Sequence, residues 1–139
     1  NVIVGFKKEV TLRQAMEFAA LNADSIGTVS GFFYYSNLPN DSLDFIKGIF
    51  LNEGIEPASA HIHALENRIV IIKNYYHLDD KSTLGKWLAI TEDPILQFED
   101  MENAKSMLFY IQAGDEKRWI EEHINDPYVR YAELNYYLP

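Results

Sequence analysis

The chain of 139 residues contains no cysteine, which excludes disulfide bonds, thiolate zinc sites and cysteine nucleophiles. It also lacks long apolar runs, and its longest apolar stretches are far too short to cross a bilayer. No segment has the pattern of a signal peptide, and the start at Asn1 rather than Met is compatible with the removal of a leader. We therefore expect no membrane insertion. A secreted or extracytoplasmic location is favoured, and the cytoplasm is also compatible with the absence of cysteine.

Basic residues are scarce as well, because 12 Lys and Arg stand against 21 Asp and Glu, giving a net charge of −9. The acidic residues are spread along the chain rather than grouped in one run. Nucleic-acid phosphates and anionic membrane surfaces both require clustered cations. The composition therefore argues against nucleic acid and fits a protein that meets a basic partner.

Apolar residues make up 47% of the chain and aromatic residues 14%, which is far too much for a disordered chain. A chain of this length buries roughly two-thirds of its unfolded surface, so one domain with a core of its own is expected over residues 1–139. The aliphatic residues 2–6 predict a buried strand. Thr11 and Gln14 then form a capping box that predicts a helix over residues 11–23, and residues 28–35 predict a second strand.

The remaining elements follow from hydrophobic spacing and turn residues. They are a helix from 41 or 42 to about 54, a hairpin of 60–65 and 68–76, a short helix within 79–93, an extended piece at 95–98, a strand at 106–112, a helix from 115 to 124 and a strand at 128–138. Each end of the chain thus has the order strand, helix, strand. This order predicts an α+β fold with a ferredoxin-like split βαβ core, an antiparallel sheet with two helices on one face. The expected core is 1–35 and 106–139, with a central α/β insertion at 36–105.

Two stretches resemble the propeptides of subtilisin-type proteases. Residues 2–7, Val-Ile-Val-Gly-Phe-Lys, are similar to their opening strand, an aliphatic run followed by Gly-Phe-Lys. Residues 125–133, Asn-Asp-Pro-Tyr-Val-Arg-Tyr-Ala-Glu, are similar to their closing segment, a helix end followed by Asp-Pro-x-Val-x-Tyr-Val-Glu. The resemblance covers residues 1–30 and 106–138, which is less than half of the chain.

The resemblance implies a protease inhibitor and folding template that docks its open sheet face on the enzyme, in cis or in trans. Its tail would lie in the substrate cleft as an added strand. The residues implied as partner contacts are Glu133, offered to a helix N-terminus of the protease, and Asn135, Tyr136, Tyr137 and Leu138. Two features depart from the family: about 75 residues separate the second and third strands, and the chain closes with Pro139. Because subtilisins seldom cut after proline, either Leu138 fills the specificity pocket or no cut occurs there.

His61 and His63 are the candidate metal ligands, since residues two apart in a strand share a face and imidazole suits zinc. A two-residue turn at Glu66-Asn67 would pair position 63 with 70 and place His77 on the opposite face. Two ligands alone favour solvent-exposed histidines over a metal site, so we expect no metal and no cofactor. The acids that could form a glycosidase pair are likewise expected to be solvated loop residues; they are Asp79, Asp80, Glu92, Asp93, Glu99, Asp100 and Glu102.

Aromatic residues crowd the predicted strands, and adjacent ones must point to opposite faces of a sheet. They are Phe32, Phe33, Tyr34, Tyr35, Tyr75, Tyr76, Tyr128, Tyr131, Tyr136 and Tyr137. One of each pair should lie away from the helices, either as a contact surface or under the insertion.

Taken with the resemblance, the sequence predicts a non-catalytic, propeptide-like binding module rather than an enzyme. The alternatives are an extracytoplasmic sensor or protein- or ligand-binding domain that uses the aromatic face, and, third, an enzyme built on the two histidines.

Overall fold

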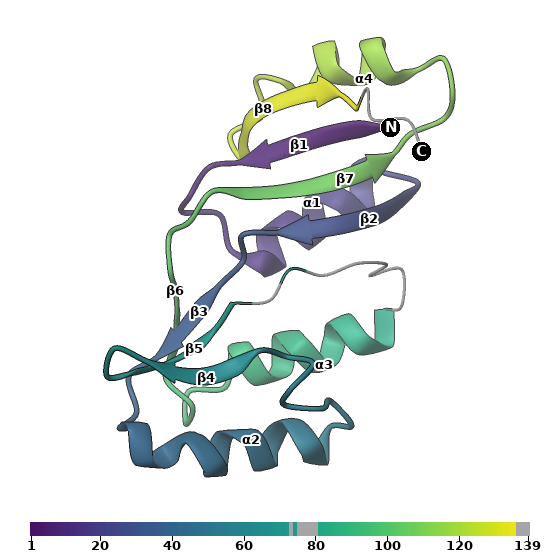
Figure 1. The fold of residues 1–139 in the computed structure, drawn as a ribbon. Helices are drawn as coiled ribbons and strands as arrows, with labels where there is room; N and C mark the ends of the chain where they lie inside the picture. Colours follow the sequence, from purple (N-terminus) through teal and green to yellow (C-terminus); the bar gives the residue numbers. More distant parts are fainter. Residues whose placement is uncertain (73, 75–80, 136–139) are drawn as a thin grey trace. The chain divides into compact units, whose positions relative to one another are not determined.

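The computed structural model describes residues 1–72, 74 and 81–135, without the side chains of 81–84, and divides the chain into two compact units (Figure 1). The described residues of the first unit are 1–31, 74 and 104–135, and those of the second are 32–72 and 81–103. Each unit contains one antiparallel sheet and helices. The predicted α+β class is therefore confirmed.

The first unit joins the two ends of the chain in a single sheet of order β2-β7-β1-β8. The strands are β1 (Val2–Phe6), β2 (Ser25–Ser30), β7 (Lys105–Tyr110) and β8 (Val129–Leu134), and every neighbouring pair is antiparallel. Helix α1 (Leu12–Asn22) connects β1 to β2, and α4 (Glu116–His123) connects β7 to β8. The sheet thus places the first strand of the chain directly beside the last, as Figure 1 shows.

Helix α1 begins where the sequence predicts. The backbone N–H of Gln14 donates to Thr11 Oγ1 over 3.1 Å, and the N–H of Thr11 donates to Gln14 Oε1 over 3.0 Å. The capping box therefore satisfies two backbone donors that the first turn of a helix leaves without partners. Behind it, Leu12, Ala15, Phe18 and Ala19 are buried at helical spacing.

One face of the first sheet holds the core of its unit. Phe6 meets Phe18 of α1 edge to face, with ring centroids 5.9 Å apart. Phe109 meets Trp119 of α4 in the same way at 5.5 Å. Because Phe18 also contacts Trp119, the two helices lie on the same face of the sheet. This arrangement is the one predicted for the helices that follow β1 and β7.

The second unit contains a sheet of order β4-β5-β3-β6. Its strands are β3 (Tyr34–Ser36), β4 (Ile62–Leu65), β5 (Arg68–Ile71) and β6 (Phe98–Asp100), and its helical segments are η1 (Asn40–Ser42), α2 (Leu43–Asn52) and α3 (Lys81–Thr91). Helices α2 and α3 meet through Phe50 and Trp87, whose rings are 5.3 Å apart. The predicted β4–β5 hairpin is confirmed, with His63 opposite Val70.

The single strand predicted over residues 28–35 is wrong, since the structure ends β2 at Ser30 and starts β3 at Tyr34. Gly31 lies between them at φ +87°, and a β-carbon there would overlap the carbonyl oxygen of Ala104. Only glycine tolerates that backbone geometry so close to another chain segment. The first unit contains residues 1–31 at one end of the chain and the residues from 104 at the other, together with Asn74.

Candidate functional site

The face of the first sheet opposite the two helices is the candidate binding surface. We call it the helix-free face, and it carries Ile3, Gly5, Leu108, Tyr110, Tyr131 and Glu133. Ile3 lies between Leu108 on β7 and Glu133 on β8, and Gly5 lies between Ser106 and Tyr131. The side chains of Ile3, Leu108 and Tyr110 are half-buried, and those of Tyr131 and Glu133 are exposed. An apolar centre with a polar rim is the usual composition of a protein contact surface.

Glycines let two tyrosine side chains lie close to this face. A β-carbon on Gly5 would overlap the ring of Tyr131, so that ring lies directly over the β1 backbone. A β-carbon on Gly27 of β2 would lie 2.9 Å from the hydroxyl oxygen of Tyr110. A tyrosine side chain presents a large, rigid contact area that ends in a hydroxyl group. Tyr110 and Tyr131 both present such an area on the helix-free face.

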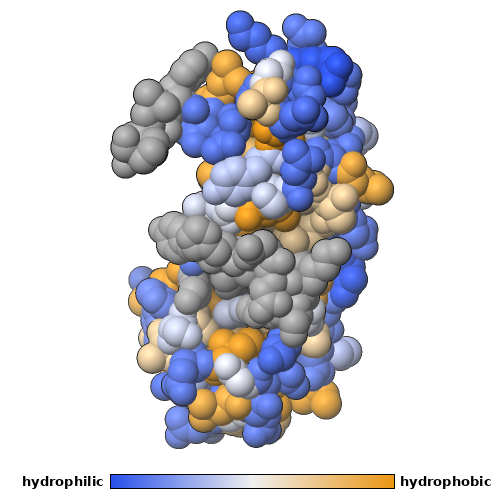
Figure 2. All heavy atoms as spheres, turned by 90° about the vertical axis from the view of Figure 1, so that its right-hand side faces the viewer, coloured by the Kyte–Doolittle hydropathy of each residue, from blue (hydrophilic) through white to orange (hydrophobic). Residues whose placement is uncertain are grey.

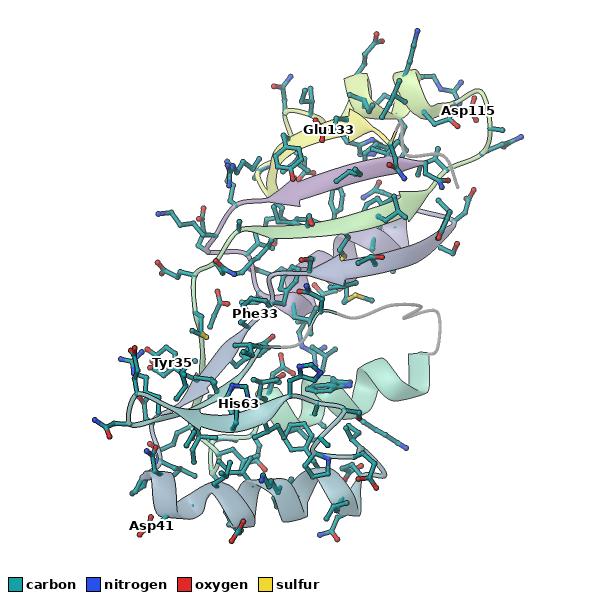
Figure 3. The ribbon with its side chains drawn as sticks, in the orientation of Figure 1. Phe33, Tyr35, Asp41, His63, Asp115 and Glu133 are labelled. Atoms are coloured by element: carbon teal, nitrogen blue, oxygen red, sulfur yellow. The ribbon has the colours of Figure 1, made fainter. Side chains whose placement is uncertain are left out.

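The segment proposed as a tail begins at the edge of the same sheet. Strand β8 is an edge strand, and the backbone N–H of Asn135 donates to the carbonyl oxygen of Asn1 over 3.0 Å. Glu133 lies on the exposed part of β8, as labelled in Figure 3. Tyr136, Tyr137 and Leu138 lie outside the described residues. Of the predicted contact residues, the structure therefore places Glu133 and Asn135 at the end of β8.

Asn74, from the central stretch of the sequence, belongs to the first unit and contacts the end of β2. Asn74 Oδ1 accepts hydrogen bonds from the hydroxyl of Ser30 over 3.1 Å and from the N–H of Gly31 over 3.3 Å. This contact is at the end of β2, where the chain leaves the first sheet. Among the described residues, hydrophobic side chains reach the surface shown in Figure 2 in several small groups rather than in one continuous patch.

The two candidate metal ligands do not form a metal site in the described part of the chain. His63 lies on β4 opposite Val70, as the predicted register requires. His61, however, precedes β4 in a turn and has φ 53°. The strand geometry that would place it on the same face as His63 therefore does not apply to it. No group of three or more His, Asp or Glu side chains able to hold a metal occurs among the described residues. His77 lies outside them.

Part of the predicted aromatic face belongs to the second unit, whose strand β3 contains Tyr34 and Tyr35. Tyr34 is buried on the side of α3, where burial raises the pKa of its hydroxyl and a hydrogen bond with Thr91 partly offsets that rise. Tyr35 points to the opposite face and donates from its hydroxyl to Glu99 Oε2 over 2.8 Å. The expectation that neighbouring aromatics take opposite faces is confirmed for this pair, although the break at Gly31 changes which sheet they belong to.

Sequence reasoning missed the side-chain network around Tyr35. Asn37 Nδ2 also donates to Glu99 Oε2 over 2.8 Å, and the guanidinium of Arg68 lies 4.3 Å from the centroid of the Tyr35 ring. The two hydrogen bonds lower the pKa of Glu99, with Asn37 the larger cause. Glu99 was predicted to be a solvated loop acid, and nothing in the local pattern around it indicates a partner sixty-four residues away.

Comparison of the chain with protein-family models, with curated proteins and with solved structures gave no match. Within the described ranges, the helices are all too short or too polar to span a membrane.

Proposed function

We propose that this chain is a non-catalytic protein-binding module that docks on a subtilisin-type serine protease, in cis or in trans, and inhibits it. The observation that carries the proposal is the pairing of β1 with β8. These are the two stretches that resemble the propeptide family, and they lie at opposite ends of the sequence. Val2 is opposite Leu134 and Ile3 is opposite Glu133.

The topology of the first unit supports the same proposal. Three features support the ferredoxin-like split βαβ core that we propose for this unit. They are the strand order β2-β7-β1-β8, the antiparallel pairings, and the position of α1 and α4 in the two connections. A core of this kind leaves one sheet face free of helices. The half-buried side chains Ile3, Leu108 and Tyr110 supply apolar contact area on that face.

The chain direction at β8 supports the role proposed for the tail. Asn135, the last described residue, follows the edge strand β8. In our proposal, the tail that starts there binds in the protease cleft as an added strand. Peptides bind protease clefts by adding a strand, in which backbone hydrogen bonds provide affinity and side-chain pockets provide selectivity. Glu133, which is exposed on β8, would be offered to a helix N-terminus of the protease, where a carboxylate is favoured.

Inhibition of subtilisin-like proteases by the isolated chain tests the proposal. We expect competitive or slow, tight-binding inhibition at micromolar concentration or below. Deletion of residues 136–139 should lower the affinity for the protease at least tenfold. Leu108→Asp, which places a charge in the centre of the helix-free face, should weaken inhibition similarly. Glu53→Gln, an exposed change in the second unit, is the matched control.

Thermal unfolding of each variant separates lost binding from lost folding. Full inhibition by both the truncated chain and Leu108→Asp would contradict the proposal, as would no inhibition across a panel of such proteases. The absence of inhibition would favour the alternative function, which is an extracytoplasmic sensor or protein- or ligand-binding domain that uses the same face. The closeness of Tyr110 and Tyr131 to glycines of the sheet favours that alternative, because binding through this aromatic face does not require the tail.

A further inference from the structure

The second sheet has a polar and aromatic face that the proposed inhibitor role does not use. We call it the Tyr35 face, and it carries Phe33, Tyr35, Asn37, His63, Arg68 and Glu99. Burial alternates along β3, with Tyr34 and Ser36 buried on the other side and Phe33 and Tyr35 half-exposed on this one (Figure 3). All six residues belong to the second unit.

Glu99 is held in one orientation on this face although it is exposed. Its Oε2 accepts from both Tyr35 and Asn37 at 2.8 Å, whereas its Oε1 has no hydrogen-bond or ion-pair partner in the described part of the chain. Arg68 lies over the Tyr35 ring, and that contact holds the ring in place. An exposed glutamate normally samples several rotamers, and fixing it removes much of the entropy cost of a later contact.

The surroundings of Glu99 indicate what could meet its free oxygen. Tyr35 is directly opposite Glu99. The backbone N–H of Met101 donates to the carbonyl oxygen of Phe33 over 3.0 Å, which continues the pairing by one more step. Phe33 and Met101 are both half-buried, so apolar surface lies beside the carboxylate. A carboxylate beside apolar surface can bind a segment with a cationic side chain and an apolar side chain next to it. The cation would pair with the carboxylate, and the apolar side chain would contact the apolar surface.

Charge favours the same occupant. The stretch from 87 to 104 contains Glu92, Asp93, Glu99, Asp100 and Glu102 and no Lys or Arg, and the whole chain has a net charge of −9. These acidic residues attract a basic partner to this edge of the second sheet. At neutral pH the carboxylate of Glu99 is ionised while lysine and arginine are protonated, and the hydrogen bonds from Asn37 and Tyr35 lower the pKa of Glu99 further. Arg68 is a cation on the same face, where it lies over the Tyr35 ring and also lowers the pKa of Glu99.

We propose that the Tyr35 face is a docking site for a protein segment in which a lysine or arginine follows or precedes an apolar residue. The cation pairs with Glu99 Oε1, and the apolar side chain lies on Phe33 and Met101. The contact is separate from the helix-free face of the first sheet, so this site and the proposed protease contact can be tested independently.

The test uses the full chain and two synthetic peptides, an amidated hexamer of alternating lysine and leucine and its counterpart with glutamate in place of lysine. We expect the lysine peptide to shift the backbone amide resonances of Phe33, Tyr35, Asn37, Glu99 and Met101, with an effect that weakens at high salt. The glutamate peptide should leave them unchanged. Glu99→Gln should weaken binding about fivefold.

Glu99→Gln keeps an acceptor for Tyr35 and Asn37, so its fold should be retained, and the amide spectrum checks this. Tyr35→Phe provides a second variant, which keeps the ring under Arg68 but removes one of the two hydrogen bonds to Glu99, and it should also weaken binding. Glu53→Gln removes the same charge from an exposed position of the same unit and should change affinity less than twofold. Equal weakening by Glu53→Gln and Glu99→Gln would overturn the proposal in favour of general charge attraction.

Two further results would also overturn it. One is the absence of shifts at these five amides with the lysine peptide at millimolar concentration. The other is self-association of the chain that Glu99→Gln abolishes, which would assign the Tyr35 face to a second copy of the protein. Loss of protease inhibition would have no bearing on this site, because the two contacts lie in different units.

Discussion

The ring of Tyr131 on β8 lies over Gly5 on β1, two residues that face each other across the pairing of the last strand with the first. This contact depends on the missing side chain at position 5, because a β-carbon there would occupy the space of the ring. Gly5 of β1 and Tyr131 of β8 are thus parts of one packing arrangement on the helix-free face, whereas Phe6 points into the core.

Replacing Gly5 with alanine should therefore destabilise the protein. The new methyl group would force the Tyr131 ring off the sheet, and we expect a loss of about 1–3 kcal/mol in the free energy of unfolding. Urea denaturation measures it. Gly48→Ala is the control, since position 48 is inside α2 with no atom near the added methyl group, and that change should stabilise by about 0.5–1 kcal/mol. A neutral Gly5→Ala would contradict the close packing of Tyr131.

Thr11→Ala should cost about 1 kcal/mol, because it removes the acceptor for the Gln14 N–H at the start of α1. Ser42→Ala is matched to it. Ser42 occupies the N-cap position of α2 but makes no capping hydrogen bond through its side chain, so its loss should change stability by less than about 0.5 kcal/mol. Equal losses in the two variants, measured by urea denaturation, would show that the capping box contributes little.

His123→Ala should weaken the contact between α4 and α1. The imidazole stacks on Trp119 at 4.2 Å, its Nδ1 lies 2.7 Å from the Trp119 carbonyl oxygen, and its Nε2 lies 3.0 Å from Asn22 Oδ1. Loss of this bridge should cost about 1–3 kcal/mol and change the near-ultraviolet circular dichroism of the tryptophan. Glu122→Ala, which removes only an exposed pair with Arg118, should have little effect.

The contribution of Glu99 to stability should depend on pH in a defined direction. Hydrogen bonds from Asn37 and Tyr35 lower its pKa below the ordinary value of 4.5, so the folded state favours the ionised form. The stabilisation is fully present above pH 4.5 and is lost as pH falls through the folded-state pKa. Glu99→Gln should therefore be less stable than the natural chain at neutral pH, with a difference that shrinks as the solution is acidified.

Urea unfolding at a series of pH values from neutral to about 3 measures this difference. Glu53→Gln, at an exposed position without such hydrogen bonds, serves as the reference for a simple change of charge. A difference between the natural chain and Glu99→Gln that stays constant over the whole series would show that the carboxylate is not stabilised in the folded state.

Local patterns in the sequence determined much of the secondary structure. The capping box at Thr11, the Glu66-Asn67 hairpin and the apolar alternation of β7 each depend on neighbours a few residues away, so their physical cause is visible in the sequence itself. The α+β class and the presence of both chain ends in one sheet followed from the order of those elements. The end of the first unit at Gly31 did not, because Ala104, which comes close to that glycine, is distant in sequence.

Only the tertiary structure decided which side chains share a face. His61 and His63 have the spacing of a ligand pair, but a left-handed residue at 61 removes the first from the strand. Tyr35, Asn37 and Glu99 have no common motif, yet the antiparallel pairing of β3 with β6 brings them into one hydrogen-bonded network. The reason is physical: propensity and capping act over one or two turns of chain, whereas strand pairing and the packing of rings depend on how distant segments meet.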